Sequence, residues 1–321
     1  MSNTLKNTHN NIQDWYRING RHDLPWRLTN DAYKVYLSEV MLQQTQVKTV
    51  LERFYFPFLE AFPTLQDLAD SNLDDVLKKW EGLGYYTRAK NLHRTAQVTG
   101  GKLPTTLEEL LKLPGIGDNT AHAIAIFAFH QAVPIMEANV KRILCRIHRL
   151  ENPTHKILWK AAYELLDSNN AYDYNQAMMD IGSMVCLPKE PKCGSCPLAE
   201  ICKGKEKPQR YPIKKKKLVP TREKDIIVYS YNDRYALQQR KERLLHGLWG
   251  FPSTDNAPYG AEYVGEVTQQ YTHFKLKCSV YHYPEANPKQ EHYFSIDSID
   301  KLAISKVDEK IIKLLLQFWN E

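Results

Sequence analysis

Apolar residues recur at helical spacing along the first two-thirds of the chain. Seven stretches share this pattern: Tyr33–Leu42, Leu73–Trp80, Leu107–Leu113, Ala121–Phe129, Ile143–Leu150, Ile157–Leu166 and Gln176–Cys186. An apolar side chain at every third or fourth position lines one face of a helix, so each stretch predicts a packed helix. No stretch before residue 203 alternates between apolar and polar residues as a strand does. The pattern therefore predicts an all-α domain over residues 1–202.

Two of these helices begin with residues that favour capping. Thr106 precedes one helix and Glu109 follows three residues later, which is the order of a capping box. Asn72 precedes another helix whose first turn is acidic. Both starts support the helix boundaries that the periodicity predicts.

The pattern changes after residue 202. Residues 203–224 contain three prolines and a run of four lysines without apolar periodicity, which predicts an extended linker. The elements predicted beyond it are a hairpin of Asp225–Tyr231 and Tyr235–Arg240 around Asn232-Asp233, a strand at Phe274–Tyr283 and an amphipathic helix at Ser305–Trp319. These elements predict a small α+β domain over residues 225–321.

Length and composition limit the class of protein. With 321 residues, of which 43% are hydrophobic, the chain can bury the cores of two domains. The longest clean apolar run, Ala123–Phe129, is too short to cross a membrane, and the polar stretch Met1–Asn11 lacks the apolar core of a secretory signal. We therefore expect a cytoplasmic protein that does not act at a membrane.

The net charge of +6 is a weak indication of nucleic acid, and its location matters more than its size. Residues 1–202 hold 22 basic and 22 acidic side chains, whereas the predicted linker holds ten basic and two acidic ones. The linker is either a solvated tether or a contact with phosphates. The predicted helical domain must bind any nucleic acid through the placement of single groups.

Four of the six cysteines fall within 17 residues, with the spacing C-x6-C-x2-C-x5-C. They are Cys186, Cys193, Cys196 and Cys202. Four thiolates suit either a zinc ion or an iron–sulfur cluster. A zinc site would favour two C-x2-C pairs and the chain has one, so the spacing favours iron–sulfur over zinc. Cys145 and Cys278 are isolated, and we expect them to be buried free thiols.

A glycine hairpin, Leu113-Pro-Gly-Ile-Gly117, lies between two predicted helices. Such a hairpin can present backbone N–H groups to a phosphate, although a tight helix–helix turn would use the same glycines. Together with the cysteine cluster, the hairpin resembles the helix–hairpin–helix DNA glycosylase superfamily in its iron–sulfur branch. The resemblance implies that the four cysteines bind a [4Fe–4S] cluster in a loop over residues 186–202.

Within that branch the chain is similar to the MutY family of adenine DNA glycosylases. The matching stretches are Leu24–Arg27, Tyr33–Val47, Glu81–Tyr86 with Arg88, and Asn175–Asp180, with weaker matches at Leu245–Pro252 and Tyr271–Phe274. The resemblance is dense over residues 13–202. It implies hydrolysis of the N-glycosidic bond of adenine mispaired with 8-oxoguanine or guanine in duplex DNA. The expected protein is a monomer that leaves an abasic site.

The resemblance assigns two carboxylates to the reaction. Glu39, between Leu37 and Val40, corresponds to the general acid that protonates adenine, although a helix carboxylate can also simply reach solvent. Glu137 stands where the family has an aspartate that stabilises the sugar cation. The extra methylene is a departure from the family, and Glu137 could instead serve only the helix dipole.

A second position separates hydrolysis from lyase chemistry. In glycosylase/lyases that resemble endonuclease III, a nucleophilic lysine lies two residues after the second hairpin glycine, and this chain has Asn119 there. An amide cannot form a Schiff base, so we expect hydrolysis alone. Lys141 is expected to contact a phosphate. The alternatives are a bifunctional lyase and a lesion-binding protein without catalysis.

The resemblance also implies a set of contacts with DNA and with the flipped base. Gln44 and Tyr85 correspond to residues that insert between bases, and Leu83 and Thr45 lie beside the oxidised guanine, although Tyr85 or Tyr86 could serve the core. The other residues assigned to DNA or to the adenine pocket are Arg21, Trp26, Arg27, Arg88, Gly115, Gly117 and Gln176.

The C-terminal domain of the family resembles hydrolases of oxidised nucleotides, the Nudix fold, and reads 8-oxoguanine. This chain lacks the glutamate-rich metal-binding helix of those hydrolases, because residues 250–265 hold only two acidic residues. We therefore expect no pyrophosphatase activity. Thr272 and His273 correspond to residues that contact the oxidised base, or they only cap the following strand.

Overall fold

The computed structural model describes residues 3–213, 218–242, 245–284 and 292–319. The chain divides into two compact units, each made of two segments. The first unit joins Met1–Gln44 to Lys102–Lys215, and the second joins Thr45–Gly101 to Lys216–Glu321. The predicted helical domain thus contributes residues to both units, because residues 45–101 group with the C-terminal part.

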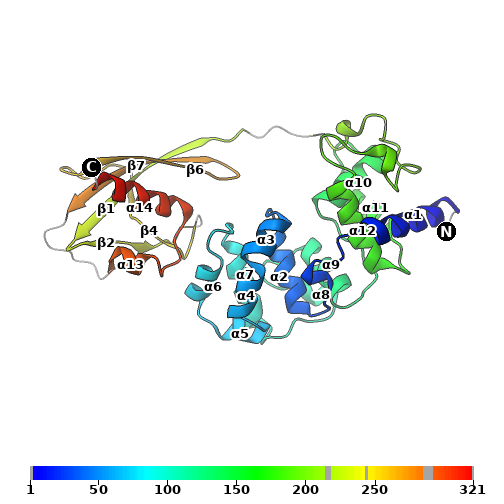
Figure 1. The fold of residues 1–321 in the computed structure, drawn as a ribbon, viewed down its shortest axis with the longest axis horizontal. Coiled ribbons are helices and arrows are strands. Elements are labelled where there is room, and N and C mark those ends of the chain that lie inside the picture. The colour runs from blue at the N-terminus through cyan, green and yellow to red at the C-terminus, as the bar shows by residue number, and fades with distance from the viewer. Residues whose placement is uncertain (1–2, 214–217, 243–244, 285–291, 320–321) are drawn as a thin grey trace. The chain divides into compact units, whose positions relative to one another are not determined.

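In the described residues of the first unit, all regular secondary structure is helical (Figure 1). Its helices are α1 (Asn3–Asn19), α2 (Ala32–Leu42), α8 (Leu107–Leu110), α9 (Asp118–Phe127), α10 (Ala138–His148), α11 (His155–Leu165) and α12 (Ala171–Met184), with 3-10 turns η1 (Pro25–Arg27), η2 (Cys193–Ser195) and η3 (Pro208–Arg210). Helix α12 packs against α1, α9 and α10, and α2 packs against α9. The all-α prediction is confirmed for the described residues up to 213.

Five more helices belong to the second unit: α3 (Val47–Arg53), α4 (Tyr55–Ala61), α5 (Leu65–Asp70), α6 (Leu73–Lys79) and α7 (Thr87–Val98). Periodicity predicts only α6 among them. Helices α3, α4 and α5 have six or seven residues each, so the apolar repeat is too short to detect. Their apolar side chains still reach a shared core, in which Phe58 packs edge-on against Trp80.

Side-chain caps begin several helices. Asn72 accepts hydrogen bonds from the N–H groups of Asp74 and Asp75, as predicted. Thr106 accepts from the Glu109 N–H, but the Glu109 carboxylate bonds the Thr106 hydroxyl at 2.7 Å, so only half of the predicted capping box is present. A complete capping box, which the periodicity does not indicate, joins Thr64 to Asp67.

The C-terminal part folds around a mixed sheet with the strand order β6-β7-β1-β2-β8 (Figure 1). The strands are β1 (Thr221–Tyr231), β2 (Arg234–Ala236), β6 (Glu262–Gln270), β7 (Lys275–Pro284) and β8 (Tyr293–Phe294); β5 (Ser253–Thr254) pairs with β1, and β3 (Gln238–Gln239) pairs with β4 (Trp249–Gly250). Strand β1 runs parallel to β7 and antiparallel to β2, so the predicted hairpin and the predicted strand are both confirmed.

Helix α14 (Lys306–Phe318) covers one face of this sheet, and α13 (Ile296–Ile299) lies beside β8. The apolar stripe of α14, with Val307, Ile311 and Leu315, is buried against the core side chains of the strands. The predicted C-terminal helix is therefore confirmed, and the fold of this part is the predicted α+β arrangement.

Both ends of the segment predicted as a linker belong to packed structure. Lys203 and Gly204 donate backbone hydrogen bonds to Ile147 and Arg146 at the end of α10, at 3.1 and 2.9 Å. At the other end, β1 begins at Thr221, because parallel pairing with β7 continues through residues 221–224. The prediction of an extended linker over the whole of 203–224 was therefore too long. None of the described helices has the length and apolarity to span a membrane.

Candidate active site

Glu39 lies on α2, which the Asp31 side chain caps by accepting hydrogen bonds from two N–H groups of the first turn. The Gln43 side chain at the end of α2 donates to the Thr120 hydroxyl on α9 at 3.3 Å. Burial and, to a smaller extent, the charge on Glu137 raise the pKa of Glu39 to about 7, although Arg27 opposes the shift. The fold thus places both predicted catalytic carboxylates within electrostatic reach of each other.

Glu137 occupies the N-cap position of α10. Its carboxylate accepts hydrogen bonds from the Val140 N–H at 3.0 Å and from the Asn139 side chain at 3.1 Å. Burial raises the pKa of Glu137, and these N–H donors oppose the shift because they favour the ionised form. The Glu137 carboxylate therefore caps α10, and its charge also raises the pKa of Glu39.

Two side-chain amides hold the segment that leads to Glu137. Asn119 accepts from the Met136 N–H at 2.8 Å, and Asn175 accepts from the Ile135 N–H at 2.9 Å. Asn175 also donates to the carbonyl of Val133 and is 1% exposed. The approach to Glu137 is therefore fixed by side chains from α9 and α12.

Asp180 forms the centre of a second buried cluster, and the sequence analysis gave it no role of its own. Arg27 donates to both of its carboxylate oxygens at 2.7 and 2.9 Å, and Arg21 donates through its backbone and its side chain. Burial would raise the pKa of Asp180, but the two guanidinium groups lower it. Both arginines predicted to line the adenine pocket are thus fixed by this carboxylate.

Two buried polar atoms in or near this cluster have no hydrogen-bond partner among the described residues, namely Arg27 Nε and the Gln176 side-chain oxygen. Gln176 is 2% exposed, and its side-chain oxygen accepts no hydrogen bond. An unpaired buried acceptor costs about 1–3 kcal/mol, which a ligand that donates a hydrogen bond would recover. Trp26, also predicted to line the pocket, is the buried residue of η1.

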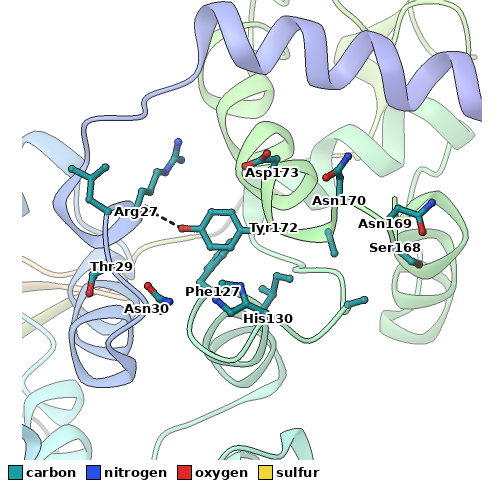
Figure 2. Close-up of a pocket in the computed structure, with 14 residues that line it drawn as sticks. Arg27, Thr29, Asn30, Phe127, His130, Ser168, Asn169, Asn170, Tyr172 and Asp173 are labelled. Carbon is teal, nitrogen blue, oxygen red and sulfur yellow. Dashed lines mark hydrogen bonds between the residues drawn. The ribbon is translucent and has the colours of Figure 1, made fainter.

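A cavity of the first unit with a volume of about 640 Å³ borders the Asp180 cluster at Arg27. Its walls come from residues 27–30, from the end of α9 and from the start of α12. Figure 2 shows Tyr172 beside Phe127 and His130, with its hydroxyl directed to the Arg27 carbonyl at 3.1 Å. Neither Glu39 nor Glu137 lines this cavity, so its size does not mark the catalytic position.

The four clustered cysteines line one small cavity of about 20 Å³. Burial and, to a smaller extent, the three other thiols raise the pKa of the Cys196 thiol to about 11, as expected for four cysteines that line one cavity. Among the described residues, no three His, Cys, Asp or Glu side chains are placed to hold a single metal ion. Cys145 and Cys278 are buried free thiols, as predicted.

Arginines of α10 connect the cysteine loop to Glu137. Arg142 donates to the Cys186 carbonyl and to the Asn139 side chain, both at 2.8 Å, and Asn139 donates to Glu137. The buried Arg146 donates to the carbonyl groups of residues 186–188 and to the Cys186 Sγ at 3.2 Å. A continuous hydrogen-bonded path therefore joins the cysteine loop to Glu137.

The predicted DNA-contacting hairpin is open to solvent. Gly115 has a positive φ of 72°, and a side chain at Gly117 would meet nothing within 4 Å. No side chain caps the start of α9, so its first N–H groups face outward. Lys141 is exposed on α10, and Gln44 is exposed with a φ of 60°.

In the second unit, the loop after α6 carries two of the predicted reading residues, Leu83 and Tyr85, and Arg88 follows on α7. Tyr85 is 42% exposed with a φ of 50°, whereas Leu83 is 7% exposed. Arg88, predicted to contact DNA, is buried instead and donates to the carbonyl groups of Leu83 and Gly84. Its guanidinium also lies over the rings of Trp80 and Tyr85, so it shapes the loop from inside.

Thr272 and His273 lie exposed in the turn between β6 and β7. The rings of Tyr271 and Phe274 stack at 4.9 Å beneath the turn. The Thr272 hydroxyl hydrogen-bonds the Tyr85 hydroxyl, which joins two predicted reading residues from distant parts of the sequence. Between β4 and β6 the described residues form one regular element, β5.

Comparisons with known proteins agree with this architecture. Residues 37–167 match the HhH-GPD superfamily base excision DNA repair protein family, and residues 226–314 match the NUDIX domain. Two solved structures cover about two-thirds of this chain. A thermostable thymine-DNA glycosylase is 28% identical with a TM-score of 0.58, over 64% of this chain and 100% of its own. An endonuclease III–DNA complex, at 19% identity and a TM-score of 0.54 over 65% of this chain and 100% of its own, shares the fold.

Among curated relatives, the adenine DNA glycosylase of Buchnera aphidicola subsp. Schizaphis graminum (strain Sg) is 40% identical over 257 residues. That alignment covers 76% of this chain and 74% of the relative. The helical fold, the NUDIX match and this relative together confirm the resemblance and the predicted fold class. The chain belongs to the adenine DNA glycosylase family of base excision repair enzymes.

Proposed function

We propose that the protein hydrolyses the N-glycosidic bond of adenine mispaired with 8-oxoguanine or guanine in duplex DNA. The observation that carries the proposal is the pair Glu39 and Glu137, whose buried surroundings raise the pKa of both and that of Glu39 to about 7. Cleavage of a glycosidic bond needs one carboxylic acid to protonate the leaving group and one carboxylate beside the sugar cation. The chain supplies both from neighbouring positions.

The two carboxylates take different roles because their surroundings differ. Burial is the main cause of the raised pKa of Glu39, so this carboxyl carries a proton near neutral pH and is suited to protonate the adenine ring. Glu137 accepts two N–H donors that favour its ionised form, so it is suited to stabilise the sugar cation.

Selection of adenine is supported by the residues around Asp180. Gln176 offers an unpaired buried acceptor, which suits the exocyclic amino group of adenine. Arg21 and Arg27 are held rigid by Asp180, and Trp26 supplies a flat apolar ring beside them. A rigid wall of this kind limits which flipped base can enter.

Hydrolysis without strand cleavage is supported by Asn119. Its side-chain oxygen accepts the Met136 N–H, and its amide nitrogen cannot form a Schiff base. Lys141 is exposed on α10 and takes the role of a phosphate contact.

Binding of the mispaired duplex, by a monomer, is assigned to groups in both units. The N–H groups around Gly115 and Gly117 bind a phosphate, Gln44 and Tyr85 insert between bases, and Leu83 and Thr45 lie beside the oxidised guanine. Thr272 and His273 read the oxidised base from the C-terminal domain, residues 225–321. The catalytic domain of this scheme is residues 1–202, with the basic segment 203–224 between them.

Cys186, Cys193, Cys196 and Cys202 would hold a [4Fe–4S] cluster. In such a cluster each cysteine binds a different iron, so the thiolates surround a common centre at wider spacing than the ligands of one zinc ion. The four thiols line one cavity, so they could surround such a centre. When bound, the cluster would cross-link the loop of residues 186–202, to which Arg142 and Arg146 are hydrogen-bonded.

A single-turnover assay on duplex DNA containing adenine opposite 8-oxoguanine tests the proposal. We expect release of free adenine and strand cleavage only after hot alkali. Prompt cleavage with a borohydride-trappable adduct would favour the lyase, and tight binding without adenine release would favour a lesion binder. Glu137→Asp in the same assay tests whether the longer side chain is functional. Absorbance at about 410 nm separates a protein with an iron–sulfur cluster from one with colourless zinc.

A further inference from the structure

Within the second unit, the end of α6 holds a backbone loop of the C-terminal part. Glu81 accepts a hydrogen bond from the Ile304 N–H at 3.2 Å through one carboxylate oxygen. Its other oxygen accepts from Lys78 Nζ at 2.6 Å, and the same ammonium group donates to the Leu302 carbonyl at 3.1 Å. An ion pair on one helix end thus binds a donor and an acceptor of the loop between α13 and α14.

That loop is fixed on both sides. Trp249 on β4 donates its N–H to the Ala303 carbonyl at 2.9 Å, and the Tyr86 hydroxyl donates to the Ile304 carbonyl at 3.4 Å. The Glu81 carboxylate is the acceptor for the Ile304 N–H, and Ile304 is 4% exposed, so that N–H would be left unsatisfied without it. The contact therefore depends on directed hydrogen bonds to the backbone and not only on opposite charges.

The contact lies four residues before Tyr85, whose hydroxyl meets Thr272. Only the short turn of Gly82 to Gly84 separates Glu81 from Tyr85, and Arg88 ties that turn down from inside. A shift of the C-terminal part on α6 would therefore move Thr272 away from Tyr85. The buried contact of Glu81 with Ile304 and the exposed contact of Tyr85 with Thr272 thus lie close along the chain in one compact unit.

We propose that Lys78 and Glu81 are positioning residues for lesion reading, which hold the C-terminal part on α6 so that Thr272 and Tyr85 act as one reading surface. The inference rests on the proposed function, because the reading surface matters only if the enzyme distinguishes 8-oxoguanine from guanine. Neither residue touches the reacting base. Their expected effect is on selectivity.

Amide hydrogen exchange and single-turnover kinetics on the full-length protein test this proposal. The variants are Glu81→Ala and the conservative Glu81→Gln, which keeps a hydrogen-bond acceptor. For Glu81→Ala we expect amide hydrogen exchange at Ile304 to become at least about tenfold faster, since its acceptor is removed. We also expect the ratio of single-turnover rates on the 8-oxoguanine and guanine mispairs to fall by roughly tenfold. Glu81→Gln should restore most of both values.

A matched control is Glu52→Gln, which breaks an exposed ion pair with Lys48 on α3 and should change neither measurement. Faster exchange at Ile304 with an unchanged rate ratio would overturn the positioning role. Unchanged exchange would overturn the contact itself. If the wild-type protein released no adenine from either mispair, the proposed function would fail, while the exchange measurement would still decide whether Glu81 holds the loop. Lys78→Met, which removes the Leu302 contact but keeps the carboxylate, repeats the test if Glu81→Ala does not fold.

Discussion

The segment that carries Glu137 and the turn that carries Thr272 are held in opposite ways. Residues 133–136 are tied by the side-chain amides of the partly buried Asn119 and the buried Asn175, which bond single backbone N–H groups at 2.8–2.9 Å. The turn at residues 271–274 is exposed and rests on one ring stack and one hydroxyl contact. Buried polar contacts fix atoms closely because breaking one is costly, whereas ring stacks tolerate small shifts. The comparison shows that the segment carrying Glu137 is held rigidly, whereas the turn carrying Thr272 can adjust its position.

Glu39→Gln should give the largest loss. Glutamine cannot donate the proton, and removal of a general acid costs 10²–10⁴-fold, so we expect adenine release to slow by about a thousandfold. Single-turnover kinetics measure the rate, and binding of the mispaired duplex should change little. An exposed acid, Glu60→Gln on α4, is the control. Full activity in Glu39→Gln would exclude Glu39 as the acid.

Asn175→Ala should give the next largest effect, on the stability of the protein. It leaves the Ile135 N–H and the Val133 carbonyl without their partner in a buried site, so we expect the free energy of unfolding to fall by about 3 kcal/mol. Chemical denaturation measures this loss. Asn19→Ala, at an exposed amide that bonds the Trp15 carbonyl, should cost far less. Equal losses in both variants would show that the segment before Glu137 is not specially anchored.

The pH profile of the single-turnover rate should follow the two carboxylates. Glu39 acts in its protonated form, so the rate should fall about tenfold per pH unit as pH rises above about 7. Glu137 acts in its ionised form, and burial raises its pKa, so the rate should also fall on the acidic side. A bell-shaped curve is expected. A rate that stays constant up to pH 9 would contradict the assignment of Glu39.

Thr272→Ala should give the smallest effect and should act on selectivity alone. Loss of the hydroxyl contact with Tyr85 should reduce the preference for 8-oxoguanine over guanine by roughly fivefold, or about 1 kcal/mol. The ratio of the two single-turnover rates measures it. Thr221→Ala, at an exposed threonine of β1, serves as the control. A parallel fall on both mispairs would mean that the turn supports binding in general.

The sequence predicts the long periodic helices, the C-terminal sheet elements and the family, because each leaves a repeat or a spacing in the chain. Helices α3, α4 and α5 are too short to show a repeat. The roles of Asn175 and Asp180 could not be predicted, since they bond groups 40 and 159 residues away. Arg88 looked like a DNA contact from its motif alone, and only packing shows that its guanidinium faces inward.

The hydrogen bond between Met136 and Asn119 has an evolutionary consequence. A lysine at position 119 would supply the nucleophile of a lyase, but an ammonium group has no acceptor for the Met136 N–H. The single substitution that introduces the new chemistry would therefore also release the backbone one residue before Glu137. A change toward lyase chemistry at position 119 would therefore loosen the backbone beside Glu137 while it added the nucleophile.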